Sequence, residues 1–181
     1  MSRKGSPVQL IFGTMGPNST TDRAPDTATG RGTYRTIRTD ASDPGFRELV
    51  TELDKDLAIR DGNEHAFFAQ FNKLHDIKHV VVVLDGMTTV GCGAFKPFEG
   101  DAVEIKRMFV PPAHRQKGIA SVVLQELERW ARELGYTRCV LETGKKQTEA
   151  IALYGKRGYN VIPNYGQYIG VESSVCFEKW V

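Results

Sequence analysis

The residues best placed to do chemistry form one stretch, Glu104 to Ala120, in which a predicted strand runs into a short loop and then into a long helix. The first backbone N–H groups of a helix have no partner within it, and the positive end of the helix dipole adds to them. Gly118 lets an anion approach these groups where a side chain would block it, and Arg115 adds a cation. The spacing therefore predicts an anion site that suits a pyrophosphate.

Hydrophobic periodicity and turn residues predict the elements that hold this stretch. Strands are expected at 34–38, 77–84, 88–95, 103–110, 139–142, 159–162 and 175–179, and helices after 42–44 and at 64–74, 118–134 and 148–156. Asp85-Gly86 is a strong hairpin turn, and Gly135 lies where a left-handed helix cap is needed. The long helix is expected to bury Ile119, Val123, Leu124, Leu127, Ala131 and Leu134 and to expose Glu126, Glu128, Arg129, Arg132 and Glu133.

The whole chain has 181 residues, of which 40% are hydrophobic and 25% charged, as in an ordinary globular protein with one sizeable core. Residues 1–32 differ from the rest, because they are rich in Gly, Pro, Ser and Thr and show little periodicity. Such a segment buries too little apolar surface to offset the entropy lost on ordering. We therefore expect a flexible N-terminal extension at 1–32 and one folded domain at 33–181.

Charge and cysteine usage argue against several classes of function. A formal net charge of +2 is too small for a general polyanion-binding surface, so nucleic acid is not expected as the main partner. Cys92, Cys139 and Cys176 form no CxxC pair, so we expect buried free thiols rather than disulfides or a metal site. No apolar run reaches the ~20 residues that span a bilayer, which predicts no membrane partner and a cytoplasmic location. The sequence leaves a homodimer open.

Several motifs occur in a fixed order around the loop. The loop reads Arg115-Gln-Lys-Gly118-Ile-Ala120, and a later helix reads Ala150-Ile-Ala-Leu153-Tyr154-Gly-Lys-Arg-Gly158-Tyr159. This combination resembles the GCN5-related N-acetyltransferase superfamily, whose pyrophosphate loop reads Q/R-x-x-G-x-G/A and whose next helix commonly reads A-x-x-L-Y-x-x-x-G-F/Y. Four more segments resemble a subgroup of small bacterial-type members: Val90-Gly-Cys-Gly-Ala94, Glu104-Ile-Lys-Arg-Met108, Leu141-Glu-Thr-Gly144 and the tail from Asn164 to Lys179.

The resemblance implies an α/β fold of the α+β kind, with a mixed, mostly antiparallel central sheet of about six to seven strands flanked by four helices. It also implies an acetyl-CoA-dependent N-acetyltransferase that moves acetyl to an amine of a small molecule by direct attack in a ternary complex. Acetyl-CoA would be the cosubstrate, without a metal. The coenzyme contacts of the family carry over to Met108, Phe109, Val110, Arg115, Gln116, Lys117, Gly118, Ile119, Ala120 and Ser121.

Two side chains match the catalytic positions of the superfamily. Glu104, on the strand that leads to the loop, is the candidate general base, and Tyr154 is the candidate acid for the departing thiolate. Backbone N–H groups from Met108 to Val110 would hold the developing oxyanion. Each side chain also has a structural alternative, since Glu104 could only pair with Lys106 or a neighbouring strand, and Tyr154 could be a core aromatic.

The acceptor site is expected to involve Arg107, Phe71 and Tyr165. Lys106 and Arg107 point to opposite faces of one strand, and either would suit a carboxylate-bearing substrate, with a solvated charge as the alternative. The segment from Tyr165 to Tyr168 looks suited to closing over a small acceptor, whereas a peptide needs an open groove. A protein acetyltransferase acting on lysine or an N-terminus, and a non-catalytic acetyl-CoA-binding regulator, are the alternative functions.

Overall fold

The computed structural model describes residues 34–71 and 73–181, so the extension predicted at 1–32 lies outside the described residues. The strands are β1 (Tyr34–Thr39), β2 (His79–Asp85), β3 (Thr88–Pro97), β4 (Ala102–Phe109), β5 (Arg138–Gly144), β6 (Asn160–Ile162) and β7 (Ser174–Trp180). The helices are α1 (Pro44–Asp61), α2 (His65–Ala69), α3 (Ile119–Glu133) and α4 (Thr148–Lys156), with 3-10 turns η1 (Gly62–Glu64), η2 (Pro112–His114) and η3 (Gly166–Tyr168). Within the described residues, no helix is long and apolar enough to cross a membrane.

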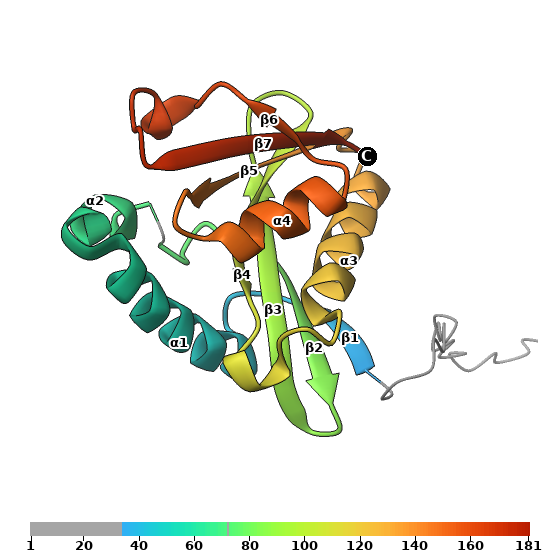
Figure 1. The fold of residues 1–181 in the computed structure, drawn as a ribbon. Helices are drawn as coiled ribbons and strands as arrows, with labels where there is room; N and C mark the ends of the chain where they lie inside the picture. Colours follow the sequence, from blue (N-terminus) through green and yellow to red (C-terminus); the bar gives the residue numbers. More distant parts are fainter. Residues whose placement is uncertain (1–33, 72) are drawn as a thin grey trace, which may run out of the picture. The chain divides into compact units, whose positions relative to one another are not determined.

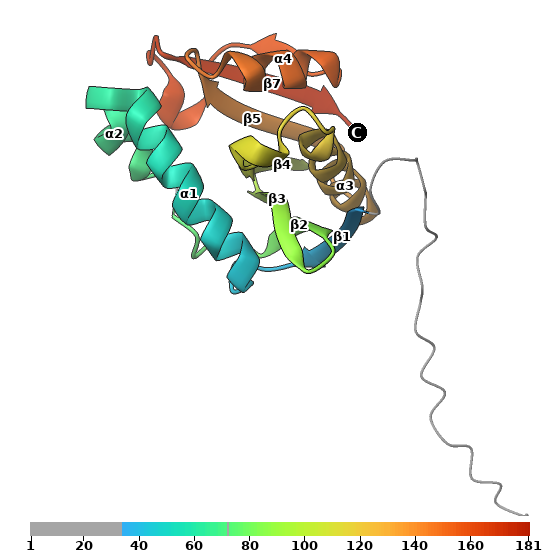
Figure 2. The same ribbon diagram turned by 60° about the horizontal axis from the view of Figure 1, so that its bottom comes forward.

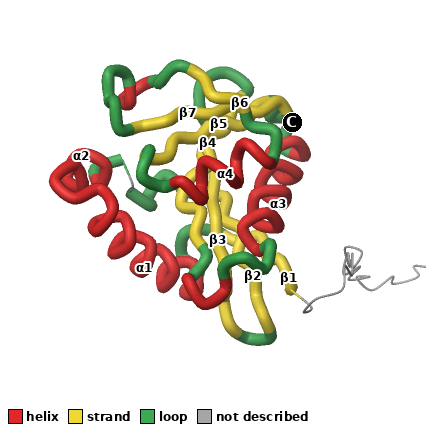
Figure 3. Tube along the Cα trace, in the orientation of Figure 1, coloured by secondary structure: helices red, strands yellow, loops and turns green. Residues whose placement is uncertain are grey.

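All seven strands join one sheet, in the order β1-β2-β3-β4-β5-β7-β6 (Figure 1). Neighbouring strands run antiparallel except for β4 and β5, which run parallel. Figure 3 shows how the helices lie around the sheet. The expected α+β fold, with its mixed and mostly antiparallel sheet and four helices, is confirmed.

Helices cover both faces of the first half of the sheet, which explains the run of valines in β2. Val81 and Val83 pack into the core formed with α3, whereas Val80 and Val82 pack into the core formed with α1. Successive side chains of a strand point to opposite faces, so one strand contributes to two cores. Figure 2 shows α1 on one side of these strands and α3 on the other. The strand before the loop is thus held from both sides.

Local signals set the helix ends where the sequence predicts them. The carboxylate of Asp43 accepts a hydrogen bond from the backbone N–H of Phe46 at 2.8 Å, and Pro44 occupies the first turn of α1. After α3, Gly135 takes a φ of 88°, the left-handed conformation that a C-terminal cap needs. The three cysteines are buried free thiols, as expected.

The helix predicted at 64–74 is much shorter than its apolar pattern suggested. It covers His65–Ala69, and none of these residues is buried. The rings of Phe67 and Phe68 pack edge to face on each other at 5.2 Å, and Phe71 packs on Tyr168. The aromatic rings therefore pack on one another and on η3 instead of on the sheet, and the helix ends at Ala69.

Two side chains of the helix predicted at 118–134 differ in burial from what periodicity predicted. Glu128 is buried, because Lys179 of β7 donates to its carboxylate at 2.6 Å and pairs the charge. Leu134 is 49% exposed, because it follows the last helical residue and turns away from the core. An ion pair between distant segments thus accounts for the burial of Glu128, and the end of the helix accounts for the exposure of Leu134.

A bulge divides β4 just before the loop. The β3–β4 register shifts so that Gly93 lies opposite both Arg107 and Met108, and Arg107 takes a φ of 58°. Such a bulge bends the strand and redirects the side chains that follow. The parallel pairing with β5 covers Ala102–Glu104 of β4 and then stops. The two central strands therefore diverge beyond this point, and a gap opens between them.

Gly93 is expected to be needed for the close approach of α3 to this bulge. A Cβ at this position would lie 2.5 Å from Met108 Sδ and 2.7 Å from Val123 Cγ1. We expect Gly93→Ala to lower the free energy of unfolding by about 1–3 kcal/mol, as overpacking of a dense core does. Gly155→Ala is the matched control: it lies in α4 with no atom near its Cβ, and should stabilise by about 0.5–1 kcal/mol. Urea unfolding of both variants measures the difference, and equal effects would contradict the packing argument.

Candidate active site

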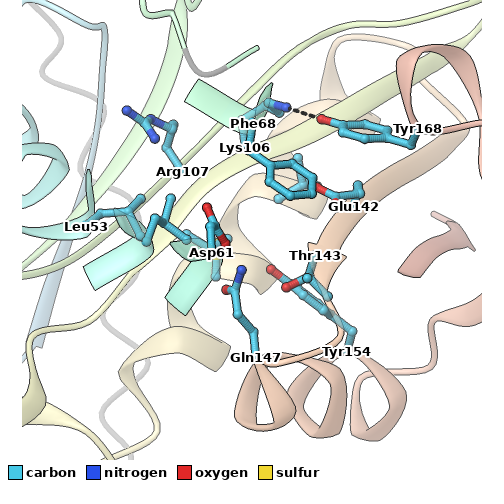
Figure 4. A pocket seen from close by; sticks show the side chains of 14 residues that line it. Leu53, Asp61, Phe68, Lys106, Arg107, Glu142, Thr143, Gln147, Tyr154 and Tyr168 are labelled. Carbon is cyan, nitrogen blue, oxygen red and sulfur yellow. Dashed lines mark hydrogen bonds between the residues drawn. The ribbon is translucent and has the colours of Figure 1, made fainter. Parts of the chain in front are cut away.

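A cavity lies where β4 and β5 diverge (Figure 4). Its walls come from four parts of the chain: α1 and α2 on one side, β4 and β5 at the base, and α4 with η3 on the other. The lining residues are Leu53, Leu57, Asp61, Phe68, Ile105, Lys106, Arg107, Met108, Glu142, Thr143, Gly144, Gln147, Tyr154 and Tyr168. Polar and titratable groups from distant segments thus meet in one place. Within the described residues, no group of three or more His, Cys, Asp or Glu side chains could hold a metal ion.

Glu142 is the carboxylate that β5 contributes to the cavity wall. The hydroxyl of Ser174 donates to Glu142 Oε1 at 2.6 Å. Burial raises the pKa of Glu142 to about 7, against the lowering effects of the Ser174 hydrogen bond and the Lys106 ammonium. A carboxyl group with a pKa near neutrality can take up and release a proton at physiological pH.

Tyr154 reaches the same cavity from α4. Its ring packs against Tyr159 and Phe177, with centroids 5.7 and 5.8 Å away. Burial raises the pKa of Tyr154, so its hydroxyl keeps its proton at neutral pH. The two interpretations drawn from the sequence are compatible, since the ring belongs to the core while the residue lines the cavity.

Glu104 lies beside the cavity rather than on its wall, to which β4 contributes Ile105–Met108. Its side chain is buried, and the Tyr165 hydroxyl donates to Oε1 at 3.2 Å. The ammonium groups of Lys96 and Lys106 each lie 3.5 Å from the carboxylate. Glu104 thus makes the ion pairs that the structural alternative foresaw, and its role as base stays a prediction.

The predicted anion site forms the start of α3. Gly118 has a φ of 82°, and no side chain caps the helix. A side chain at Gly118 would point into open space, so the first N–H groups of α3 are approachable. Lys117 is exposed, and Gln116 takes a φ of 63°. The geometry suits an anion, and the coenzyme contacts assigned to 115–121 stay a prediction.

Arg115 is engaged within the protein. Its Nε donates to the carbonyl of Val110 at 3.0 Å, and its Nη2 lies 3.5 Å from Asp56 of α1. The guanidinium therefore ties the loop to the end of β4 and to α1. Met108 lines the cavity, whereas Phe109 and Val110 are buried, so this segment also links the cavity to the loop.

The three predicted substrate residues lie in different places. Arg107 lines the first cavity; its Nη2 pairs with Asp54 at 2.8 Å, and its buried Nε and Nη1 have no partner among the described residues. Phe71 lines a second cavity, which also borders Lys106. Tyr165 holds Glu104. The three residues therefore do not share one surface, and their part in binding the acceptor stays a prediction.

Sequence reasoning missed Glu142 as a chemical group. A signal was present, because Glu142 is a single carboxylate in a strand whose neighbours Leu141 and Thr143 are buried. A carboxylate in such a strand needs either a partner or a function. The sequence alone did not show that β4 moves away from β5 at this height.

Comparison of the sequence with known proteins identifies a family. Residues 42–159, more than half of the chain, match the acetyltransferase (GNAT) family. An IAA acetyltransferase of Azospirillum brasilense is 38% identical over 136 residues, which cover 73% of this chain and 88% of that protein. The uncharacterized N-acetyltransferase YjgM of Escherichia coli is 34% identical over 124 residues, 67% of this chain and 66% of that protein.

Solved structures share the same fold. A GNAT family acetyltransferase from Elizabethkingia anophelis with acetyl-CoA bound superposes with a TM-score of 0.60, covering 82% of this chain and 98% of that chain. Its sequence identity is 18%, so this likeness concerns the fold alone. Taken with the family match and the 38% identical relative, it leads to one conclusion: the chain belongs to the GNAT acetyltransferase family and is an acyltransferase.

Proposed function

We propose that the protein transfers the acetyl group of acetyl-CoA to the amine of a small molecule, by direct attack in a ternary complex. The observation that carries this proposal is the cavity between β4 and β5, which Glu142, Tyr154 and Met108, close before the loop that leads to α3, all line. A general base, a general acid and an anion-binding helix start are the three parts that such a transfer requires. The Azospirillum relative carries the name of a small-molecule acetyltransferase, which supports the same substrate class.

The chain has features that fit acetyl-CoA. The uncapped start of α3 offers backbone N–H groups to a pyrophosphate, and Gly118 keeps the approach free. Met108 lines the cavity where β4 and β5 no longer pair, and its backbone would contact a ligand chain there. When bound, the coenzyme supplies an acetyl thioester, whose carbonyl carbon is the site of attack. N–H groups from Met108 to Val110 would donate to the carbonyl oxygen as its negative charge grows.

Glu142 takes the proton of the acceptor ammonium. An alkyl ammonium with a pKa near ~10 is mostly charged at pH 7, so it must lose a proton before its nitrogen can attack. The raised pKa of Glu142, about 7, makes its carboxylate a better proton acceptor than an exposed glutamate while leaving much of it ionised at neutral pH. The hydrogen bond from Ser174 fixes the direction of the carboxylate.

Tyr154 gives a proton to the departing sulfur and takes one back as the attacking nitrogen loses its second proton and becomes an amide. Glu104 positions the neighbouring groups. A thiolate with a pKa near ~8.5 leaves more easily when a hydroxyl donates to it. Glu104 holds Lys106 and Tyr165 against the side of the cavity, which orients the cation next to Glu142. A direct role for Glu104 as base is the competing hypothesis, and the paired variants considered in the Discussion distinguish the two.

A thiol-release screen tests the proposed function. The full chain would be incubated with acetyl-CoA and panels of amino acids, polyamines, aminoglycosides and lysine-containing peptides, and free coenzyme A thiol would be measured. We expect amine-dependent release with at least one small-molecule panel and much less with peptides. Preference for peptides would favour a protein acetyltransferase. Tight binding of acetyl-CoA without release for any amine would instead mark a non-catalytic binding protein and would refute the proposal.

A further inference from the structure

A second cavity, of about 180 Å³, adjoins the first along one side chain. Lys106 lines both cavities, so it forms part of the wall between them. The second cavity is otherwise bounded by the segment that joins α2 to β2, by the end of β3 and by η3. Its remaining lining residues are Gln70, Phe71, Lys73, His75, Asp76, Ile77, Lys96 and Gln167.

The second cavity carries an excess of positive charge. Three ammonium groups border it, from Lys73, Lys96 and Lys106, against one carboxylate, Asp76, which lies 3.0 Å from His75. Glu104 lies behind two of the lysines and contacts each at 3.5 Å, a distance too long for a strong charge-assisted hydrogen bond. The single carboxylate of Glu104 therefore leaves N–H donors of Lys96 and Lys106 without a close acceptor.

Counting donors identifies the groups that remain. Lysine has three N–H donors. Lys106 directs one to the Tyr168 hydroxyl at 3.1 Å and one toward Glu104, as Figure 4 shows for the first contact. Lys96 has Glu104 as its one partner within the described part of the chain. At least one donor of Lys106 and two of Lys96 remain for a ligand that enters the second cavity.

Two carboxylates line the first cavity together with two cations: Lys106, which the second cavity shares, and Arg107, which pairs with Asp54. The carboxylates are Glu142 and Asp61, and burial raises the pKa of each, Glu142 to about 7. An ammonium group placed there would be attracted to these carboxylates, while an anion placed near Lys96 would be attracted to the lysines. The first cavity thus offers carboxylates to an amine, and the second offers spare ammonium donors to an anion, with Lys106 bordering both.

We propose that the acceptor is a zwitterion, an amine that also carries a carboxylate, with its amine in the first cavity and its carboxylate in the second. The inference rests on the proposed function and names its substrate class. Lys96 and Lys106 bind the carboxylate and so determine specificity. Polyamines are disfavoured, because a second ammonium would face these lysines, where like charges repel. Neutral amines lose the attraction but not the attacking group.

Matched acid and amide pairs test the charge requirement. Amino acids of increasing length, such as glycine, β-alanine and 4-aminobutyrate, together with aromatic amino acids, would each be compared with their carboxamides in the thiol-release assay. We expect the best acid to exceed its amide in kcat/KM by ~10-fold or more, the scale of one charge-assisted hydrogen bond. Lys96→Gln should reduce this acid-to-amide ratio by ~10-fold. Lys78→Gln removes the same charge from an exposed residue outside the cavity, and should leave the ratio unchanged.

A second measurement does not depend on turnover. NMR signals of the lysine side chains, assigned with the Lys96→Gln and Lys106→Met variants, would be followed in the coenzyme A complex while each acid or amide is added. We expect the acids, and not the amides, to shift the signals of Lys96 and Lys106. Equal use of acids and amides, or a preference for diamines, overturns the zwitterion and leaves the acetyltransferase proposal intact. Absence of turnover with every amine overturns the proposed function, and the NMR shifts alone then decide the anion site.

Discussion

Glu142→Gln is expected to lower kcat/KM by ~10²-fold or more while coenzyme affinity stays near the wild-type value. Glutamine keeps the shape of the side chain and can still accept the hydrogen bond from Ser174, but it cannot accept a proton from the acceptor. Steady-state thiol release and calorimetry with coenzyme A measure the two quantities. A loss of coenzyme affinity of similar size would mean that the residue supports the cavity instead of the chemistry.

The pH profile separates the base from the other groups. Glu142 must be ionised to act, so kcat/KM of the wild type should rise with pH through an apparent pKa near the folded value of about 7. In Glu142→Gln this limb should vanish and leave only the dependence on free amine. Glu104→Gln should lower activity but keep the limb. If the limb disappears in Glu104→Gln and persists in Glu142→Gln, Glu104 is the base, and the assignment made from the sequence is the correct one.

Glu142→Gln should also be more stable than the wild type above neutral pH. The pKa of Glu142 is raised from 4.5 to about 7 in the folded protein, so between these values the folded state binds more protons than the unfolded state. Stability contributed by this group is therefore present at low pH and is lost as pH rises to 7. Above pH 7, Glu142→Gln is expected to unfold with a free energy roughly 1–3 kcal/mol higher than the wild type. Below pH 4.5 the difference should disappear in urea unfolding.

Gly118→Glu is expected to weaken coenzyme A binding by ~100-fold or more, because it brings bulk and negative charge to the place where backbone N–H groups would meet a pyrophosphate. The folded protein has space for the side chain, so the loss should appear in binding more than in stability. The positive φ of 82° adds about 1–2 kcal/mol of strain for any residue with a Cβ. Calorimetry with coenzyme A is the measurement.

Gly135→Glu provides the matched control at the other end of α3. Gly135 also has a positive φ, 88°, and open space around its Cβ, so the variant carries the same strain and the same charge. It lies beyond the C-terminus of the helix, away from the predicted pyrophosphate site. We expect wild-type coenzyme affinity for this variant. Equal affinity for coenzyme A in Gly118→Glu and Gly135→Glu would show that the loop does not bind the coenzyme.

The elements of the fold could be predicted largely from the sequence, because their signals are local. The hairpin at Asp85-Gly86, the cap at Gly135 and the start of α1 after Asp43 each depend on the conformational preferences of a few neighbouring residues. The helix at 148–156 was predicted with the bounds that the structure shows. Local preference failed where contacts between distant segments compete with it, as in the early end of α2.

The tertiary structure decided which carboxylate faces the cavity. Glu104 and Glu142 both lie on central strands, and the sequence favoured Glu104 because it precedes the loop. The bulge at Arg107 and the end of the β4–β5 pairing after Glu104 leave Glu104 beside Lys96 and Lys106, while Glu142 lines the gap. Strand periodicity sets the face of a side chain, but the separation of two strands depends on everything packed around them.

The arrangement of charges around Lys106 could not be predicted from the sequence either. The charged and polar groups around it come from β3, β4, β5 and η3, and Tyr168 lies 62 residues away from it along the chain. Local rules indicate only that Lys106 is a cation on a strand. Its contact with Tyr168 and its place between two cavities follow from the folding of the C-terminal segment onto β4. The sequence alone determined the family and predicted the anion-binding loop, because both depend on short motifs. The arrangement of charges around the two cavities required the packing of the whole domain.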